Sequence, residues 1–472
     1  MFDRFVSDDT PHEECGVFGV YDLDGADCAE QVYYGLFALQ HRGQESCGIA
    51  ANDCGVVSYY KDMGLVPDVL TKPVLDTLHG DIAIGHVRYS TAGGSLPENA
   101  QPLVMRYSKG TLAIAHNGNL ANTAGLRKQL EKDGAIFQTT IDSELIAYAV
   151  AKSRLQCHSV EKAVELSMQV LQGSYSLLVM SPRKLIAARD PWGIRPLCIG
   201  KAGNAWYFAS ESCALDAVGA EFVRDVKPGE IITIDQNGFH SNTENCQEKC
   251  SHCIFEYIYF ARPDSRLDGV SVAKSREMAG RSLARQKPVD AEGVVGGPAS
   301  GLVAAAGYSM ESGIPCVKGF VKNNYVGRTF IKPSQNQRVD SVRIKLNPLR
   351  ENVEGKRVIM IDDSIVRGTT SARIVKLLKD AGAKEVHVRI SSPPFLYPCY
   401  FGTDVPSSEE LAATGRSVEE VGKLIGADSL DYLDVNSLNQ LIDSNHYCHG
   451  CFTGSYPIRV EPEDEDWRFK KI

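Results

Sequence analysis

One short stretch, Val358 to Ser371, constrains the fold more than any other part of this chain. Its opening apolar residues predict a short buried strand. Asp362 and Asp363 follow where that strand ends, and Gly368 allows a tight turn before an apolar helical pattern begins. Ligands of open α/β sheets gather at the carboxyl ends of strands, so this order predicts a nucleotide-type site.

The chemistry of the stretch narrows the choice of ligand. The turn places backbone N–H groups and hydroxyls at a helix N-terminus, which suits a phosphate. Asp362 and Asp363 cannot hold that phosphate themselves, but they suit sugar hydroxyls or a Mg²⁺ shell that the phosphates share. The alternative is a plain helix N-cap with acids favoured by the helix dipole. The length and order of the run favour a ribose phosphate with a metal ion.

The same stretch closely resembles the signature with which type I phosphoribosyltransferases bind phosphoribosyl diphosphate (PRPP). That resemblance implies PRPP contacts from Asp362, Asp363, Ser364, Arg367, Gly368, Thr369 and Thr370. Upstream, the small residues of Gly293 to Gly301 let the backbone approach a diphosphate. The resemblance implies that Ser300 binds Mg²⁺ together with the two aspartates. Relatives often carry an acid or a polar residue where this chain has Ala299.

A second part of the transferase pattern lies between these two segments. Lys322 to Phe330 resembles the mobile loop that orders over PRPP in these transferases, which makes Lys322 and Arg328 expected diphosphate contacts. Relatives usually have arginine where Asn324 stands, so no charge role is expected of Asn324.

At the other end of the chain, Cys15 opens an apolar run after a polar segment. Met1 to Glu14 contains five acids and no apolar core, so it is not a signal peptide. One interpretation makes Cys15 a small buried residue in an edge strand. The other makes it a nucleophile that becomes the chain terminus after residues 1–14 are removed as a propeptide.

Five segments in order resemble the glutaminase domain of the N-terminal-nucleophile (Ntn) amidotransferases: Cys15–Gly19, Leu39–Glu45, Gly85–Thr91, Ala115–Asn119 and Thr140–Glu144. The resemblance implies that Cys15 attacks the amide of glutamine. Its own α-amino group can be the base, which requires the free amine. The Asn117 side chain and the Gly118 N–H are the implied oxyanion donors. The resemblance also implies that Arg88 binds the α-carboxylate of glutamine and that Asp142 binds its α-amine. Arg42 resembles a loop residue that closes over the substrate.

Fourteen cysteines stand in the chain, and some are expected to be buried small hydrophobes. Cys246, Cys250 and Cys253 have the C-x₃-C-x₂-C spacing of a radical enzyme's iron–sulfur motif, one alternative for this region. Cys253 to Asp264 instead resembles the start of the transferase half of the glutamine PRPP amidotransferase family. The iron–sulfur members of that family imply Cys253, Cys399, Cys448 and Cys451 as ligands of a 4Fe–4S cluster. Four thiols alone suit zinc equally well.

Together these features predict an α/β and α+β chain of two domains. Residues 15–246 are expected to form an αββα Ntn-hydrolase glutaminase domain, and residues 253–472 an α/β type I phosphoribosyltransferase domain that ends in cluster-binding helices. Residues 407–425 and 431–442 are expected to be helical. The net charge of −9 argues against a general nucleic-acid surface, and no apolar run reaches membrane-spanning length. A cytoplasmic enzyme with mostly reduced thiols is therefore expected.

The resemblance implies conversion of glutamine, PRPP and water to phosphoribosylamine, glutamate and diphosphate, the first committed step of purine synthesis. Ammonia would pass inside the protein between the two sites. The family also implies Mg²⁺, feedback inhibition by purine nucleotides and a homo-oligomer, a tetramer or dimer. Two alternatives stay open: a glucosamine-6-phosphate synthase type of amidotransferase, and a non-catalytic regulator on a phosphoribosyltransferase fold. Each accounts for only one half of the motifs.

Overall fold

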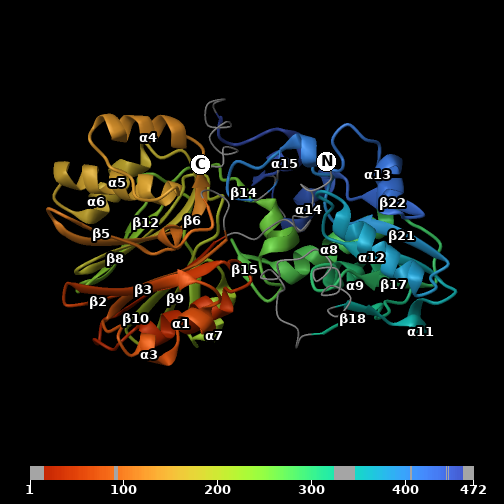
Figure 1. The fold of residues 1–472 in the computed structure, drawn as a ribbon, viewed down its shortest axis with the longest axis horizontal. Coiled ribbons are helices and arrows are strands. Elements are labelled where there is room, and N and C mark those ends of the chain that lie inside the picture. Colours follow the sequence, from red (N-terminus) through yellow and green to blue (C-terminus); the bar gives the residue numbers. More distant parts are fainter. Residues whose placement is uncertain are drawn as a thin grey trace.

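The computed structural model of the protein describes residues 15–89, 94–323, 346–403, 405, 407–442, 444 and 446–460. The first half of the chain builds two antiparallel sheets, one above the other, and the second half builds a parallel sheet beside them (Figure 1). The predicted propeptide, residues 1–14, and Arg328 lie outside the described residues.

The first sheet has seven strands in the order β11-β9-β10-β1-β4-β2-β3. Their bounds are β1 Gly16–Asp22, β2 Ser46–Asp53, β3 Val56–Met63, β4 Ile82–Arg88, β9 Cys198–Ala202, β10 Ala205–Ala209 and β11 Glu221–Asp225. Strand β1 pairs with β10 on one side and β4 on the other, so it is a central strand. The interpretation of the Cys15 segment as an edge strand is therefore wrong.

The second sheet has six strands in the order β13-β12-β8-β7-β6-β5. Their bounds are β5 Leu103–Tyr107, β6 Gly110–Leu120, β7 Gly173–Ser181, β8 Lys184–Arg189, β12 Ile231–Asp235 and β13 Gly238–Asn242. Helices α1 Ala29–Ala38, α2 Val66–Val69, α3 Lys72–Leu75 and α7 Ser212–Ala217 belong to the first layer, and α4 Thr123–Lys132, α5 Asp142–Gln156 and α6 Val160–Met168 to the second. A short 3₁₀ turn, η1, spans Pro97–Asn99.

Side-chain alternation along β1 explains why these layers stack. Val17 and Tyr21 belong to the apolar core between the two sheets, while Phe18 and Val20 belong to the core beneath the helices of the first layer. Successive residues of a strand point to opposite faces, so an all-apolar strand needs cover on both sides. The resulting order of helix, sheet, sheet and helix confirms the predicted αββα glutaminase fold.

The second half centres on a four-stranded parallel sheet in the order β17-β20-β21-β22. These strands span Gly293–Gly296, Arg357–Asp362, Glu385–Ile390 and Ser429–Tyr432. Val358 and Met360 of β20 pack toward α12 Thr369–Asp380 and α13 Val418–Ile425. Ile359 and Ile361 pack into the core that contains α8 Val272–Gln286 and α9 Leu302–Ser312. The predicted α/β transferase fold is confirmed.

The prediction of two long helices near the end of the chain is wrong. Residues 408–410 form only a 3₁₀ turn, η3, before α13, and Ser429–Tyr432 is the strand β22. In β22 the buried Leu430 and Tyr432 alternate with half-buried residues, and pairing with β21 outweighs the local helical preference. Only Leu438–Ile442, α14, is helical in the second segment.

The remaining elements are short: β14 His252–Cys253, η2 Glu256–Phe260, β15 Arg266–Leu267, β16 Val270–Ser271, β18 Phe320–Lys322, β19 Leu346–Pro348, α11 Arg350–Val353, η4 Val435–Ser437, β23 Tyr447–Cys448 and α15 Gly450–Thr453. Among the described segments, every helix is too short or too polar to cross a membrane.

Candidate active sites

The first candidate site begins at Cys15, directly before β1. Its side chain is buried, and Sγ lies 3.7 Å from the Tyr89 carbonyl oxygen at the end of β4. Because Gly16 pairs with Val87, the antiparallel register places Cys15 beside Arg88. The fold therefore brings the predicted nucleophile and a predicted glutamine contact to the same sheet edge.

Asn117 and Gly118 come from β6 of the opposing sheet, and Ser210 ties them to the nucleophile strand. The Ser210 hydroxyl accepts hydrogen bonds from the Val17 N–H at 3.0 Å and from Asn117 Nδ2 at 3.3 Å. Among the described groups, the buried Asn117 Oδ1 has no hydrogen-bond partner. Gly118 has φ +146°, and a Cβ there would lie 2.1 Å from the Ser174 carbonyl oxygen. Only glycine fits this position without moving β7.

Arg88 and Asp142 are both buried at this site. Arg88 Nη1 donates to the Gly94 carbonyl at 3.3 Å and lies 3.9 Å from Glu45. Asp142 is the first residue of α5, and it accepts a hydrogen bond from the Leu120 N–H at 2.8 Å. Burial raises the pKa of Asp142, but the nearby His116 and several hydrogen bonds outweigh burial and lower the pKa overall. The carboxylate is thus charged, as a partner for an amine requires.

Arg42 lies behind the nucleophile, fully buried. Its Nε donates to the Cys15 carbonyl at 3.1 Å, and Nη1 donates to Glu211 at 2.7 Å. Nη1 and Nη2 also form a two-point contact with Glu256, at 2.9 and 2.7 Å. The guanidinium is therefore held by two carboxylates in this structure, and the expected contact with glutamine stays a prediction.

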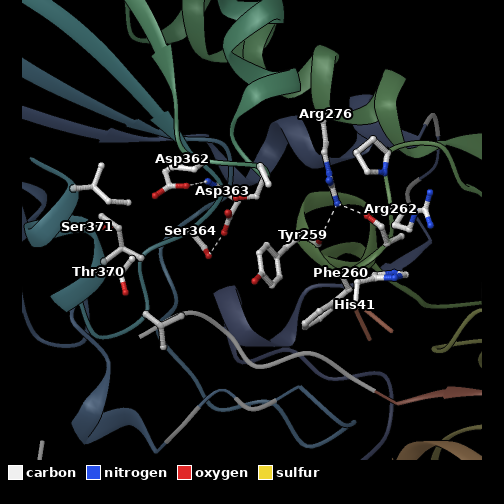
Figure 2. A pocket seen from close by; sticks show the side chains of 18 of the residues that line it. His41, Tyr259, Phe260, Arg262, Arg276, Asp362, Asp363, Ser364, Thr370 and Ser371 are labelled. Carbon is white, nitrogen blue, oxygen red and sulfur yellow. Dashed lines mark hydrogen bonds between the residues drawn. The ribbon is translucent and has the colours of Figure 1, made fainter. Parts of the chain in front are cut away.

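The second candidate site is a cavity of about 410 Å³ at the carboxyl end of β20. Six of the residues expected at the PRPP and Mg²⁺ sites line it: Ser300, Lys322, Asp362, Asp363, Ser364 and Thr370. Figure 2 shows the two aspartates and Ser364 on one wall, with Tyr259, Arg262 and Arg276 facing them. His41, from the glutaminase half, also lines the cavity, which is therefore shared between the halves.

The two aspartates are buried side by side. Burial and the charge of Asp363 raise the pKa of Asp362 well above its ordinary value. Burial also raises the pKa of Asp363, although hydrogen bonds from the Ser300 and Ser364 hydroxyls oppose the rise. Two buried carboxyl groups side by side are costly to ionise, and a bound divalent cation would offset that cost.

The loop between β17 and α9 lies directly against this pair. A Cβ on Gly297 would approach Asp362 Oδ1 to 2.5 Å, so the loop backbone packs onto the carboxylate. Ala299 has φ +79°, a left-handed conformation that costs a non-glycine residue on the order of 1–2 kcal/mol. This strained residue stands next to Ser300, and such strain often marks a functional loop.

The turn after the aspartates has the predicted form. Gly368 has φ +88° and caps the N-terminus of α12, whose residues Thr370 and Ser371 line the cavity. Arg367 Nε instead donates to Glu410 at 3.1 Å. Arg367, Gly368 and Thr369 therefore shape the turn, and their contacts with PRPP stay predictions.

The four predicted cluster cysteines converge at the domain boundary. Strands β14 and β23 pair in parallel with Cys253 opposite Cys448. Burial raises the pKa of Cys451 well above its ordinary value, and the proximity of the Cys399, Cys253 and Cys448 thiols raises the pKa further. Burial raises the pKa of Cys448 to about 12, with Cys399 again adding to the rise. Over the described ranges, the side chains as placed form no ready-made metal site of three or more ligands.

The alternative cysteine run does not gather at one point. The charged neighbours of Cys246 are Glu230, Lys227 and Arg224, whereas Cys250 lies beside His252. The set of Cys253, Cys399, Cys448 and Cys451 is the one that the fold brings together, and this disfavours the radical-enzyme motif.

The sequence predicts only a packing role for residues 189–196, a segment that contains Arg195 at the junction of the halves. Arg195 is fully buried, and it donates to the Phe401 carbonyl at 3.0 Å and to Glu256 at 3.2 Å. Phe401 also accepts a hydrogen bond from Ser174 at 2.7 Å, next to Gly118 in the adjoining strand. The segment that follows Cys399 therefore rests on the glutaminase strands. No sequence signal singled out Arg195, because its segment, Arg189 to Pro196, also contains the charged Arg189 and Asp190.

Comparison with known proteins agrees with both halves of the chain. Residues 86–217 match a family described as a glutamine amidotransferase domain. The chain is 49% identical over 464 residues to an amidophosphoribosyltransferase of Methanocaldococcus jannaschii, covering 95% of this chain and 98% of the relative. It is 48% identical over 454 residues to the same enzyme of Archaeoglobus fulgidus, covering 95% and 99%. The solved glutamine PRPP amidotransferase of Bacillus subtilis, complexed with ADP and GMP, is similar with a TM-score of 0.89 and 46% identity, covering 95% and 98%.

Proposed function

The chain belongs to the amidophosphoribosyltransferase family, and from this premise we propose how it transfers the amide nitrogen of glutamine to PRPP. The products are 5-phosphoribosylamine, glutamate and diphosphate, and the reaction is the first committed step of purine synthesis. The observation that carries the proposal is the presence of both reactive pockets in one chain, with His41 of the glutaminase half in the wall of the phosphoribosyl cavity. Neither a glucosamine-6-phosphate synthase type of amidotransferase nor a non-catalytic regulator would need both.

In the glutaminase pocket, the Cys15 thiol attacks the side-chain amide of glutamine. The Cys15 α-amine takes the thiol proton and returns it to the leaving ammonia, which requires removal of residues 1–14. Asn117 Nδ2 and the Gly118 N–H stabilise the oxyanion, and the buried setting strengthens these hydrogen bonds. Arg88 and Asp142 hold the two charged groups of the substrate's amino-acid end. Water then hydrolyses the thioester left on Cys15, which releases glutamate and restores the thiol, while ammonia crosses to the second pocket inside the protein.

In the phosphoribosyl pocket, Asp362, Asp363 and Ser300 would hold Mg²⁺. The two aspartates fit a divalent cation because they are buried side by side and each raises the cost of ionising the pair. Bound Mg²⁺ would neutralise the charge on the departing diphosphate. The turn at Gly368 and the N-terminus of α12 bind the sugar's phosphate, and Lys322 lies where it can contact the diphosphate. Tyr259 and Phe260 give the facing wall an apolar surface that helps to exclude water.

The four converging thiols fit a soft metal centre, and we favour a 4Fe–4S cluster held by Cys253, Cys399, Cys448 and Cys451. Such a cluster would fasten the end of the chain to both halves, because Cys253 precedes η2 and the segment after Cys399 contacts the glutaminase strands. We propose a structural role for it, since none of the four cysteines lines the phosphoribosyl cavity.

Other expectations from the family remain proposals. They are a homo-oligomer, cytoplasmic location and feedback inhibition by purine nucleotides. The nucleotide proposal is supported by the ADP and GMP named in the Bacillus subtilis complex.

Isotope transfer tests the function directly. Glutamine labelled with ¹⁵N at the amide is mixed with PRPP, Mg²⁺ and unlabelled ammonium, and the nitrogen in phosphoribosylamine is measured. Internal transfer predicts that the product keeps the label despite the ammonium in solution. Label diluted to the solution value would contradict the internal passage, and absence of phosphoribosylamine would contradict the function itself.

A further inference from the structure

Ser210 holds two groups that the fold brings from opposite sheets. It directly follows β10, whose pairing with β1 ends where Ala209 lies opposite Phe18. The Ser210 N–H donates to the Val17 carbonyl at 3.0 Å, and the Ser210 hydroxyl accepts the Val17 N–H at 3.0 Å. The side chain therefore takes the place of a main-chain acceptor in the ladder, two residues after the nucleophile Cys15.

Asn117 reaches the same hydroxyl from the second sheet. Ala113 and Ala115 belong to the core between the sheets, so alternation along β6 places Asn117 on that same face. Asn117 and Ser210 are both fully buried, and Asn117 Nδ2 donates to the Ser210 hydroxyl at 3.3 Å. The apolar core between the sheets thus ends in a polar contact beside the nucleophile strand.

The Asn117 amide has little other support. Within the described part of the chain, its Oδ1 has no hydrogen-bond partner, and the Ser210 hydroxyl is the one partner of its Nδ2. Buried polar atoms are nearly always paired, and a catalytic role is one of the usual reasons for an exception. An amide nitrogen carries two hydrogens. One is given to Ser210, so the other remains for a reacting group.

We propose that Ser210 is a positioning residue for the glutaminase reaction, which orients the Asn117 amide so that its second N–H faces the oxyanion formed at Cys15. The proposal rests on the proposed function, in which Asn117 and Gly118 are the oxyanion donors. Such donors are effective because they are fixed before the charge develops. The Ser210 hydroxyl is itself fixed by Val17, in the strand that begins next to Cys15, so the donor and the nucleophile share one support.

Kinetics with glutamine and, separately, with ammonium test the proposal, with PRPP and Mg²⁺ present in both assays. Ser210→Ala should lower kcat for glutamate formation by about 10- to 100-fold, because removal of an oxyanion donor itself costs about 10²- to 10³-fold. KM for glutamine should stay unchanged, since the affected hydrogen bond forms only in the transition state. Phosphoribosylamine formation from ammonium should also stay unchanged.

A double-mutant cycle with Asn117→Ala separates positioning from a merely structural role. If Ser210 acts through the Asn117 amide, Ser210→Ala should cause no further loss of kcat once Asn117 is replaced. A hydroxyl that only satisfies the Val17 N–H would instead lower kcat by the same factor in both backgrounds. Ser210→Cys is the second variant if the alanine variant does not fold, because a thiol is close in size and only a weak acceptor, and it should lower kcat in the same way.

Ser176→Ala is the matched control. Ser176 lies opposite Asn117 in β7, is equally buried, and donates to the Arg195 and Pro196 carbonyls. This variant should keep the wild-type kcat. The proposal is overturned if the Ser210 variants keep the wild-type kcat, if they raise KM for glutamine with kcat unchanged, if their loss persists in the Asn117→Ala background, or if Ser176→Ala loses as much. If the wild-type enzyme forms no glutamate from glutamine, the proposed function fails instead.

Discussion

Replacing Asp363 by asparagine should stabilise the Mg²⁺-free protein while it abolishes the transferase reaction. The reason is the buried acid pair, in which burial and the neighbouring acid raise the pKa of Asp362 and burial raises that of Asp363. At an effective dielectric constant near 20, two charges a few ångströms apart repel by on the order of 3–4 kcal/mol. Asparagine removes the repulsion but weakens the hydrogen bonds from Ser300 and Ser364, at a cost of roughly 1 kcal/mol. A net gain of about 2–3 kcal/mol follows.

The sign of the pH dependence follows from the raised pKa values. A carboxyl whose pKa is higher in the folded state destabilises that state above the folded pKa, and this penalty vanishes below the unfolded pKa near ~3.9. The stability advantage of Asp363→Asn should therefore be largest at neutral pH and shrink as the pH falls. Asp428→Asn in the same domain is the matched control, because the pKa of Asp428 is lowered and the same substitution should destabilise.

Thermal unfolding midpoints, recorded with and without Mg²⁺, measure these effects. Each kcal/mol shifts the midpoint of a domain of this size by about 2–4 °C. Mg²⁺ at a hundred times its Kd should stabilise the wild type by about 2.7 kcal/mol and the variant by much less. An Asp363→Asn protein that is less stable than wild type at neutral pH without Mg²⁺, or one that Mg²⁺ stabilises equally, would refute the reasoning. The variant should also make no phosphoribosylamine from glutamine or from ammonium.

Three further outcomes are expected. Gly118→Ala forces a Cβ against the Ser174 carbonyl and should lower glutamine-dependent activity at least ~10²-fold, with ammonium-dependent activity kept; equal loss of both would contradict the assignment of Gly118. Purified wild type should be brown and contain iron, which Cys451→Ala should lose and Cys250→Ala should keep, by metal analysis and absorption spectra; stoichiometric zinc would show the cluster proposal to be wrong. Ala299→Val places a β-branched residue at positive φ and should raise KM for PRPP, whereas Ala299→Gly, the control, should not. An unchanged KM in both variants would mean that the backbone strain at Ala299 is unrelated to PRPP binding.

The sequence predicted best those parts of the sites whose functional residues lie within one short segment of the chain. Asp362, Asp363 and Gly368 lie within seven consecutive residues, so a strand, two acids and a turn could be recognised together. Cys15, Asn117 and Asp142 come from separate segments, and their convergence was available only through resemblance to a family. The structure adds the register of β1 and β4 and the Ser210 contact that link them.

What the sequence could not predict is the set of contacts across the domain boundary. In the sequence, Glu211 lies between two serines and Glu256 lies in an apolar run, and only the fold shows that both meet Arg42. The wrong prediction of a helix at residues 431–432 has the same origin, because these residues belong to β22 and pairing with β21 decides their conformation. The spacing of apolar residues within a short segment does not reveal that the segment pairs with a strand far away in the sequence.

The central claim is that one pocket frees nitrogen and a second pocket attaches it to the activated sugar. Cys15→Ser tests this most directly when phosphoribosylamine is measured with glutamine and, separately, with ammonium as the nitrogen source, and Cys54→Ser, an exposed thiol in the same half, is the control. The account predicts that Cys15→Ser loses the glutamine-dependent reaction and keeps the ammonium-dependent one. Loss of both reactions, or retention of both, would contradict it.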